Sequence, residues 1–439
     1  MADGGLKPAS AMRDGESGIM GEELMEIPSP MQANEMFEAA LGVKAPWFIQ
    51  GIGFDQAQRC LNVGIDFVAG SRFEAAGAKG THPVHDTEVK RYRHLNFFQF
   101  ECILEVRVPR VKLPDGRVVL VQPPWAGKKS GFTLLFEALV LMLAQQMPFA
   151  AVARIVEESP YRVQALCEKY VELAEAMSDL SEVTALAIDE TSYRRGQRYV
   201  TLTADAERRR VVHVVKGKEA SAIARLAEHL RARNADPQQI TEVSIDMSQA
   251  FINGVEAHLP NARITFDKFH VIAHASAALE KTRRVEQKTA PDLKGMRWLL
   301  LKAPDKLGRD QRQALDQLIA RAASRRTARA WLQREQLREI LTCRQPNVLT
   351  KALTAWCRHV MRTRVESMKE VVAMIRRHFD GIAAWARSRQ TNGFLEALNG
   401  LFQASKRRAR GYTRFETIRT VIFLIAGKLD YSAVNPHAR

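Results

Sequence analysis

Three acidic residues in this chain stand where carboxylates can do metal chemistry. Asp189 closes the small apolar run Thr184-Ala-Leu-Ala-Ile-Asp189, and Asp246 closes a second run, Thr241-Glu-Val-Ser-Ile-Asp246. Such runs predict buried strands that each deliver a charge to a sheet edge or cleft. Glu396 lies much later, beside the apolar stripe of a predicted amphipathic helix.

Carboxylates that crowd together without a cation repel one another and resist ionisation. Mg²⁺ prefers oxygen ligands and keeps positions open for substrate phosphates, so an acidic cluster in a basic protein indicates metal and phosphate. Two such ions, about 3.5–4 Å apart, activate the attacking oxygen and stabilise the leaving oxygen of a phosphodiester. We therefore expect Asp189, Asp246 and Glu396 to bind Mg²⁺, with Mn²⁺ as a substitute.

Other residues compete for these roles. Asp267 also ends a strand-like run and is the main rival for the second acid, and Glu190 and Asp205 are weaker rivals. Strand-end aspartates often serve as caps or turn residues instead. His270 could approach the same cleft or be a structural histidine. Two asparagines, Asn392 and Asn399, flank Glu396 on the same side of its helix.

The elements that must position these acids form one unit between residues 184 and 267. Strands are also predicted at Arg198–Asp205 and Arg210–Val215, with turns at Gly196 and at residues 206–208. Helices are predicted near residues 219–233 and 249–258. The order strand, strand, strand, helix, strand, helix, strand predicts a mixed sheet with helices on its faces.

Composition limits the class of protein. The chain has 439 residues, enough for about three domains, and 65 lysines and arginines against 49 acids, a formal charge of +16. This balance favours a polyanionic partner, nucleic acid first and an acidic membrane surface second. No apolar run is long enough to span a bilayer, and no signal peptide is recognisable. Five scattered cysteines indicate reduced thiols and a soluble cytoplasmic protein.

The N-terminal third predicts a small β module. Its expected strands are Trp47–Phe54, Cys60–Val68, Phe97–Val108 and Arg117–Val121, with a hairpin turn at residues 114–116. The module contains His82, His85, His94 and Cys102, whose spacing is not that of a zinc site. Surface histidines are the simpler interpretation.

Helices follow at residues 132–146, 148–156 and 160–173, and the last two have the length of a helix-turn-helix. In that motif Tyr161, Arg162 and Gln164 would reach base edges; the alternative is an ordinary helical hairpin. A basic, almost wholly helical stretch covers residues 269–388. The late cluster Lys406, Arg407, Arg408 and Arg410 either contacts phosphates or is a solvated charge run.

Four segments together resemble the DDE transposases of bacterial insertion sequences, in particular the ISL3 family. They are Ala187-Ile-Asp-Glu-Thr191, Ser244-Ile-Asp-Met-Ser-Gln-Ala-Phe251, Phe266-Asp-Lys-Phe-His270 and the stretch from Asn392 to Gly411. The segments His82-Pro-Val-His-Asp86 and Arg93-His-Leu95 also resemble the family's N-terminal region. The resemblance covers most of the chain, from about Phe37 to Leu429.

The resemblance implies a multidomain α+β protein whose ribonuclease-H-like catalytic domain is interrupted by a helical insertion. The acidic triad would fall on Asp189, Asp246 and Glu396. The expected parts are a flexible leader (1–30), an N-terminal β module (31–122), a helix-turn-helix region (131–178), the first part of the catalytic core (183–268), the insertion (269–388) and the last part of the core (389–439).

One departure concerns metal in the N-terminal module. Family members usually carry a zinc-binding module with cysteine pairs, whereas residues 77–80 and 113–116 here contain none. We therefore expect no structural zinc.

The activity implied is binding of terminal inverted repeats, metal-dependent cutting of the element's ends and joining to target DNA. Because two ends must be paired, a homodimer or larger assembly on double-stranded DNA is expected, associated with the bacterial nucleoid. Two alternatives stay open. One is a non-catalytic DNA-binding protein or transposase relic, and the other is a ribonuclease-H-like nuclease that cuts without joining.

Overall fold

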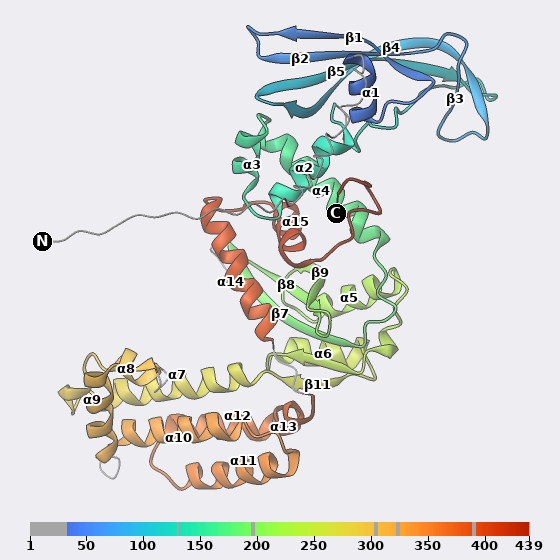
Figure 1. Ribbon diagram of the computed structural model, residues 1–439. Coiled ribbons are helices and arrows are strands. Elements are labelled where there is room, and N and C mark those ends of the chain that lie inside the picture. The colour runs from blue at the N-terminus through green and yellow to red at the C-terminus, as the bar shows by residue number, and fades with distance from the viewer. Residues whose placement is uncertain are drawn as a thin grey trace, which may run out of the picture. The chain divides into compact units, whose positions relative to one another are not determined.

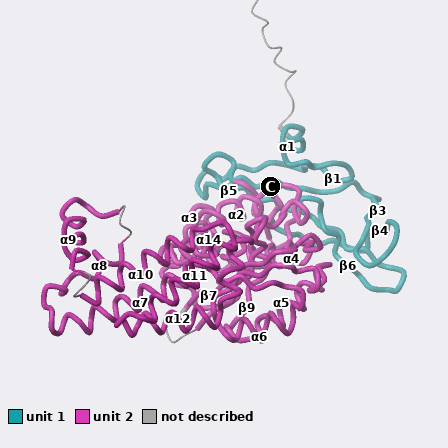
Figure 2. The backbone as a smooth tube through the Cα atoms, turned by 90° about the horizontal axis from the view of Figure 1, so that it is seen from below, with its two compact units in different colours: residues 1–92, 96–125 teal, residues 93–95, 126–439 magenta. Residues whose placement is uncertain are grey.

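The computed structural model describes residues 33–129, 131–194, 198–302, 306–321, 325–388 and 392–438. The leader predicted for residues 1–30 and the turn predicted at Gly196 lie outside these ranges. The chain divides into two compact units, residues 1–92 with 96–125, and residues 93–95 with 126–439 (Figure 2).

The first unit is built on a six-stranded sheet. The path of hydrogen-bonded neighbours is β1-β2-β5-β4-β3, and β6 pairs with β5. Its elements are α1 (Ala33–Leu41), β1 (Trp47–Asp55), β2 (Cys60–Phe67), β3 (Arg72–Glu74), β4 (Thr81–Phe97), β5 (Phe100–Lys112) and β6 (Val118–Leu120). Trp47 contacts the rings of Phe67, Phe73 and Trp125, so aromatic packing stabilises one end of the sheet.

The prediction of one strand from Phe97 to Val108 was wrong at its start. Phe97 ends β4, Phe98 adopts a left-handed conformation with φ 53°, and Phe100 begins β5. The long strand β4 was missed because its sequence, rich in histidine and charge, lacks a clear apolar alternation.

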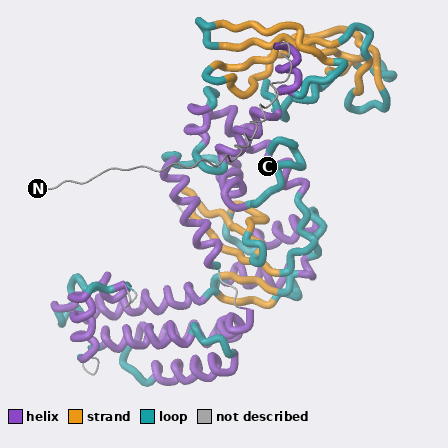
Figure 3. The backbone as a smooth tube through the Cα atoms, in the orientation of Figure 1, coloured by secondary structure: helices purple, strands orange, loops and turns teal. Residues whose placement is uncertain are grey.

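The second unit contains a five-stranded sheet in the order β11-β10-β7-β8-β9 (Figures 1 and 3). Its strands are β7 (Ala185–Arg194), β8 (Arg198–Asp205), β9 (Arg210–Lys216), β10 (Glu242–Ile245) and β11 (Arg263–Phe266). The first three pair antiparallel, and β10 lies parallel to both β7 and β11. The predicted mixed sheet and order of elements are confirmed.

Strand β7 does not end at Asp189, contrary to the prediction from its apolar run. Its pairing with β10 stops at the pair Ala187 and Ser244, whereas its pairing with β8 continues to Arg194. Asp189 therefore lies within the strand, just past the point where the β10 ladder ends. Strand β10 ends at Ile245, so Asp246 directly follows its last residue, as predicted.

Helices cover both faces of this sheet. Leu186 and Ile188 of β7 join one apolar cluster with residues of α5 (Ser221–Arg231) and α6 (Gln249–His258). Ala187, which points to the opposite face, joins a second cluster with residues of α14 (Gly393–Arg408) and α15 (Phe415–Ala426). Asp189 is two residues beyond Ala187, so its side chain lies on the α14 face.

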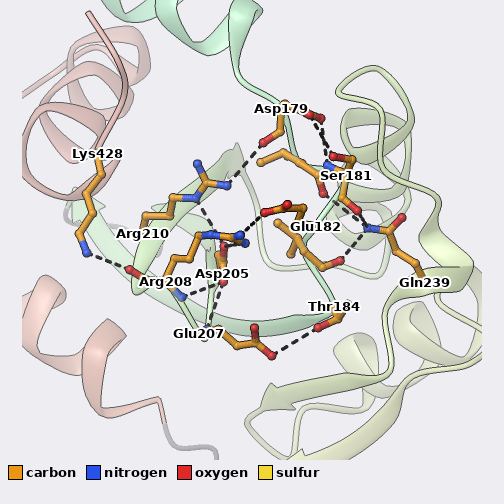
Figure 4. Close-up of polar contacts among 12 residues, drawn as sticks. Asp179, Ser181, Glu182, Thr184, Asp205, Glu207, Arg208, Arg210, Gln239 and Lys428 are labelled. Atoms are coloured by element: carbon orange, nitrogen blue, oxygen red, sulfur yellow. Dashed lines mark hydrogen bonds and ion pairs between the residues drawn. The ribbon is translucent and has the colours of Figure 1, made fainter.

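A polar network holds the start of β7 (Figure 4). Nε2 of Gln239 donates to the carbonyl oxygens of Ser181 (2.7 Å) and Val183 (2.9 Å). Across the sheet, Asp205 pairs with Arg210 and accepts the backbone N–H groups that follow it. These contacts fix the strand at the end opposite its acidic residue.

Three helices, α2 (Leu134–Ala144), α3 (Phe149–Ile155) and α4 (Pro160–Met177), precede the sheet. Ser159 caps α4 by accepting the N–H of Arg162, and α4 runs one turn beyond its predicted end. The basic stretch after β11 folds into α7 (Lys268–Glu286), α8 (Arg297–Leu301), α9 (Arg309–Ala320), α10 (Arg326–Ile340), α11 (Pro346–Met361), α12 (Glu366–Arg377) and α13 (Phe379–Ser388). Figure 1 shows these helices stacked beside the β11 edge of the sheet.

Candidate active site

Acidic side chains meet at one end of the second unit's sheet. Asp246 and Asp267 directly follow β10 and β11, and these strands run parallel to β7, which carries Asp189. The carboxyl ends of parallel strands share one edge of a sheet, where open α/β proteins bind ligands. Burial raises the pKa of Asp189, and the negative charge of Asp246 raises it further, as expected for neighbouring carboxylates.

Asp189 is buried and held on both oxygens. Oδ1 accepts the backbone N–H of Glu190 at 2.8 Å, and Oδ2 accepts Nδ2 of Asn399 at 2.9 Å. Burial raises the pKa of this carboxyl to about 6, and the charges of Asp246 and Glu190 add to the rise. The bond from the Glu190 amide and the nearby His270 oppose it. A divalent cation would relieve this desolvation and repulsion.

Glu396 lies in the first turn of α14 and is exposed. Its carboxylate, that of Asp267 and a ring nitrogen of His270 offer ligand atoms within 4.8 Å of one another. Partial burial and then the charge of Asp267 raise the pKa of Glu396, while His270 lowers it. The late helix therefore brings its acid to the strand-end cluster.

Asp267 has no exposed surface, and it is held by backbone donors. One oxygen caps α7 by accepting the N–H of Phe269 at 3.0 Å, and the other accepts the N–H of Asn392 at 2.9 Å. Nδ2 of Asn392 in turn donates to the carbonyl oxygen of Ile188 at 3.1 Å. Asp267 and Asn392 thus fix the first turn of α14 against β7, next to Asp189.

The donor set fits a hard divalent cation. Among the described residues, no lysine or arginine forms an ion pair with the clustered acids, which are Asp189, Asp246, Asp267 and Glu396. The neighbouring Glu190 pairs with Lys218 at 3.7 Å. Nε2 of His270 and Oδ1 of Asn399 are buried without a hydrogen-bond partner. Carboxylate and amide oxygens are ligands that Mg²⁺ accepts, and unsatisfied buried polar atoms indicate a missing ion or water.

The two weaker candidates for the second acid, Glu190 and Asp205, lie in different places. Asp205 lies in the network at the other end of the sheet and does not reach the cluster (Figure 4). Glu190 does lie near it: burial raises its pKa and the charge of Asp246 raises it further, while Lys218 lowers it. Lys218 could not be predicted as a neighbour of Glu190, since nothing in its local pattern links it to a residue 28 positions earlier.

The predicted base-reading residues sit at the start of α4. Tyr161 is 72% exposed. The guanidinium of Arg162 lies 4.0 Å from the centroid of the Phe132 ring and pairs with Glu158 at 2.7 Å. Nε2 of Gln164 donates to Thr417 of α15 at 2.8 Å, so this amide is directed into its own unit.

The late basic cluster lies beyond the acidic site on the same helix. Lys406, Arg407 and Arg408 form the last turn of α14. Arg410 and Gly411 then adopt left-handed conformations with φ 58° and 109°, which turn the chain toward α15. None of these four basic residues pairs with an acid in the described part of the chain.

The histidines and cysteine of the N-terminal region do not form a ligand set in the described ranges, where the one group of three or more metal-type ligands is Asp267, His270 and Glu396. His82 and Cys102 are buried in the first unit, and Nδ1 of His94 lies 2.9 Å from Oγ1 of Thr133 in the second. Among the described helices, none combines the length and apolar character needed to cross a membrane.

The helix pair α3 and α4 and the acidic cluster at the strand ends suit a protein that processes DNA. Comparison with known families agrees. Residues 186–422 match the DDE transposase model of the ISL3 type, and residues 121–171 match the helix-turn-helix domain of transposase family ISL3. The chain belongs to the ISL3 family of DDE transposases.

Curated relatives carry the same description. The chain is 28% identical over 350 residues to the transposase for insertion sequence element IS1001 of Bordetella parapertussis, a match covering 77% of this chain and 84% of that protein. It is 26% identical over 419 residues to the transposase for IS1557 of Mycobacterium tuberculosis, covering 87% of this chain and 93% of the relative.

Proposed function

We propose that this protein cuts the ends of an insertion sequence and joins them to target DNA, using Asp189, Asp246 and Glu396 as its catalytic triad. The observation that carries the proposal is the acidic cluster at the strand ends. There the charge of Asp246 raises the pKa of Asp189 of β7, and Glu396 of α14 offers a ligand atom within 4.8 Å of those of Asp267 and His270. The strand order, with three antiparallel strands followed by two parallel ones, supports a ribonuclease-H-like core.

The three carboxylates would hold Mg²⁺ or Mn²⁺. When bound, these ions activate the attacking oxygen and stabilise the leaving oxygen of a phosphodiester. The chain's own residues keep the ligands in place: Asn399 orients Asp189, and Asp267 with Asn392 fixes the turn that carries Glu396. Such outer partners set the direction of a ligand's lone pairs.

The reaction proceeds in two steps, a hydrolysis and then a transesterification. Water attacks a phosphodiester at the element's end, and the bond to the 3′-oxygen of the element breaks, leaving a 3′-hydroxyl. That hydroxyl attacks a target phosphodiester, forms a new bond to the phosphorus and releases a target 3′-hydroxyl. The second step conserves the number of phosphodiester bonds, so it needs no external energy source.

DNA binding is divided between two regions in this proposal. The start of α4, with Tyr161 and Arg162, reads the terminal inverted repeat, whereas the predicted role of Gln164 is not kept because its amide donates to Thr417. The cluster Lys406, Arg407, Arg408 and Arg410 contacts phosphates near the cut, a sequence-independent and salt-sensitive role. Joining two ends to one target requires at least two active sites, so the protein acts as a homodimer or larger on DNA.

A strand-transfer assay tests this function. A labelled duplex carrying the element's end is incubated with the full-length protein, a target plasmid and Mg²⁺ or Mn²⁺. The proposal expects both a cut product and a joined product, and neither in EDTA. Cutting without joining would identify a nuclease, and binding without cutting would identify a non-catalytic DNA-binding protein.

A further inference from the structure

The chain's positive charge is concentrated in one segment. Residues 268–388, which form α7 to α13, contain 26 lysines and arginines against 11 aspartates and glutamates, a balance of +15 (26 − 11). The whole chain carries +16. The helical insertion therefore holds nearly all of the excess, although the acidic site and the helix-turn-helix lie elsewhere.

Within this insertion, α11 and its two ends present a stripe of cations. Lys351, Arg358 and Arg362 recur at intervals of seven and four residues, the spacing of one side of a helix with 3.6 residues per turn, and Arg344 lies two residues before the helix begins. All four are exposed, and no described acid forms an ion pair with any of them. We call these four residues the α11 stripe.

The opposite side of α11 is its core side. Leu349, Leu353, Trp356 and Val360 are buried there, where the helix packs against α10, α12 and α13. Figure 1 shows α11 at the outer margin of the helical stack. The α11 stripe therefore faces away from the stack, and no packing within it accounts for these charges.

The composition around the stripe strengthens this point. Between Glu339 and Glu366 the chain contains no acidic residue at all. Elsewhere in the insertion, some basic side chains do pair with acids: Lys281 pairs with Glu370, and Arg284 pairs with Glu280. A solvated helix face normally mixes both signs of charge, so a run of cations alone favours a polyanion as partner.

A groove beside α11 leads toward the acidic site. Its lining includes Thr350 of α11, Arg377 and Arg387 at the ends of α12 and α13, Phe266 of β11, and Arg263, which pairs with Glu242; the acids Glu256 and Asp380 also line it. Neither Arg377 nor Arg387 pairs with a described acid. Strand β11 spans four residues, about 13 Å, from Arg263 to Phe266, and Asp267 of the acidic cluster comes next.

We infer that the α11 stripe and this groove bind the phosphate backbone of double-stranded DNA without reading its sequence. The helix that carries the stripe has 16 residues and is about 24 Å long, which is less than one turn of the duplex. Lysine and arginine at successive turns of an exposed helix face suit phosphates, whose contacts carry no sequence information. The biological use of this surface rests on the proposed function, but its DNA affinity does not.

The test measures binding of the full-length protein to a random-sequence 40-base-pair duplex, by fluorescence anisotropy in EDTA, so that no cleavage occurs. The stripe variant replaces Lys351, Arg358 and Arg362 with glutamine. A matched control replaces three ion-paired cations of the same insertion, Lys281, Arg284 and Lys369, with glutamine. Both variants lose the same charge, and circular dichroism establishes that each is folded.

Every cation that no longer reaches a phosphate should lower the slope of log Kobs against log salt by about 0.9. We expect the stripe variant to lose about two to three units of slope and at least about tenfold in affinity at ~0.1 M salt, and the control to change little. An equal loss in both variants, or none in the stripe variant, would overturn the inference.

Two further comparisons decide the nature of the partner. A duplex carrying the element's end should lose affinity by the same factor as the random duplex; a loss confined to the element's end would contradict sequence-independent binding. Vesicles containing phosphatidylserine should bind wild type and stripe variant alike, and a stripe-dependent vesicle interaction with unchanged DNA binding would also refute the proposal. None of these results depends on whether the triad is catalytic.

Discussion

Nδ2 of Asn399 donates a 2.9 Å hydrogen bond to Oδ2 of Asp189, across 210 positions of sequence. Asn399 lies one turn after Glu396 on α14, so the same helix that supplies one acid also orients another. At the other end of this turn, Asn392 donates to the carbonyl oxygen of Ile188, the residue before Asp189. Two asparagines thus bracket Glu396 and attach its helix to β7.

This arrangement predicts that Asn399 is a positioning residue. In Asn399→Ala the Asp189 carboxylate loses its side-chain donor but keeps its bond from the Glu190 amide. We expect cleavage of an element-end duplex to slow by about 10–100-fold, with DNA affinity unchanged, because partners of metal ligands have effects of this size. Initial cleavage rates as a function of Mg²⁺ concentration measure the change.

Gln403 provides the matched control. It lies one turn further along α14 and donates to Oγ1 of Thr191 and to the carbonyl oxygen of Ser192, so it joins the same helix and strand without touching an acid of the cluster. Gln403→Ala should cost stability but leave the Mg²⁺ dependence of the rate unchanged. If both variants shift the rate and the Mg²⁺ dependence equally, Asn399 serves only to pack the helix.

Asp267 gives a second prediction. Its oxygens accept the N–H of Phe269 and of Asn392, so Asp267→Ala removes a helix cap and leaves a buried amide unpaired. We expect a loss of about 2–3 kcal/mol in the free energy of unfolding, and reduced but measurable cleavage. Urea denaturation and the cleavage assay measure the two effects. Complete loss of cleavage in Asp267→Ala, together with activity in Asp246→Ala, would make Asp267 the second acid.

A third prediction concerns the helices that precede the sheet. The buried carboxylate of Glu137 accepts the backbone N–H groups of Lys128 and Lys129 at 2.7 Å and the hydroxyl of Tyr170 at 2.6 Å. Asn435 donates to that hydroxyl at 3.0 Å. Tyr170→Phe removes one hydrogen bond from Glu137, which keeps its two backbone donors, and one from Asn435, which still donates to the carbonyl oxygen of Leu134. We expect it to destabilise the protein by about 1–3 kcal/mol in urea denaturation. An unchanged midpoint would show that water replaces the hydroxyl.

The fourth prediction is a pH dependence of stability. Burial lowers the pKa of His213 to about 3 and that of His229 to about 4, and Arg225 and Arg233 add to the two shifts. The ring centroids lie 4.7 Å apart, and Nδ1 of His229 lies 4.0 Å from Glu175, which also pairs with Arg419. Both histidines are therefore neutral in the folded protein at pH 7.

The direction of the pH dependence follows from the unfolded chain, whose histidines bind a proton near pH 6.5. Below that value the unfolded state takes up more protons, so the stability contributed by neutral histidines is full above pH 6.5 and falls as the pH drops toward 4. As the pH falls from 6.5 to 5, each buried neutral histidine lowers the free energy of unfolding by about 2 kcal/mol. His213→Phe should reduce the loss of unfolding free energy over this interval by about that amount. An unchanged pH dependence would contradict neutral burial.

Much of the second unit follows from local sequence patterns. The helix predicted at residues 249–258 coincides with α6, and Asp246 and Asp267 stand where their apolar runs end. Short buried strands between helices appear in the sequence as short runs of apolar residues, so their order could be predicted. Strand β7 was harder, because Glu190, Thr191 and Ser192 are polar residues that pair only with β8.

The contacts that organise the site could not be predicted in the same way. The asparagines were placed on the side of Glu396 by helical spacing, but their partners, Asp189 and the carbonyl oxygen of Ile188, are more than 200 residues away. Likewise, the amide of Gln164 is directed at Thr417 because α15 packs on α4, a contact with no local signal. Tertiary packing decides which polar groups face one another.

The central claim is that Asp189, Asp246 and Glu396 form the catalytic triad. The most direct measurement compares wild type with Asp189→Ala, Asp246→Ala and Glu396→Ala in binding and cleavage of one labelled element-end duplex with Mg²⁺ or Mn²⁺. We expect all three variants to bind the duplex like wild type and to lose both cutting and joining. Normal cutting by any of the three variants would contradict the claim.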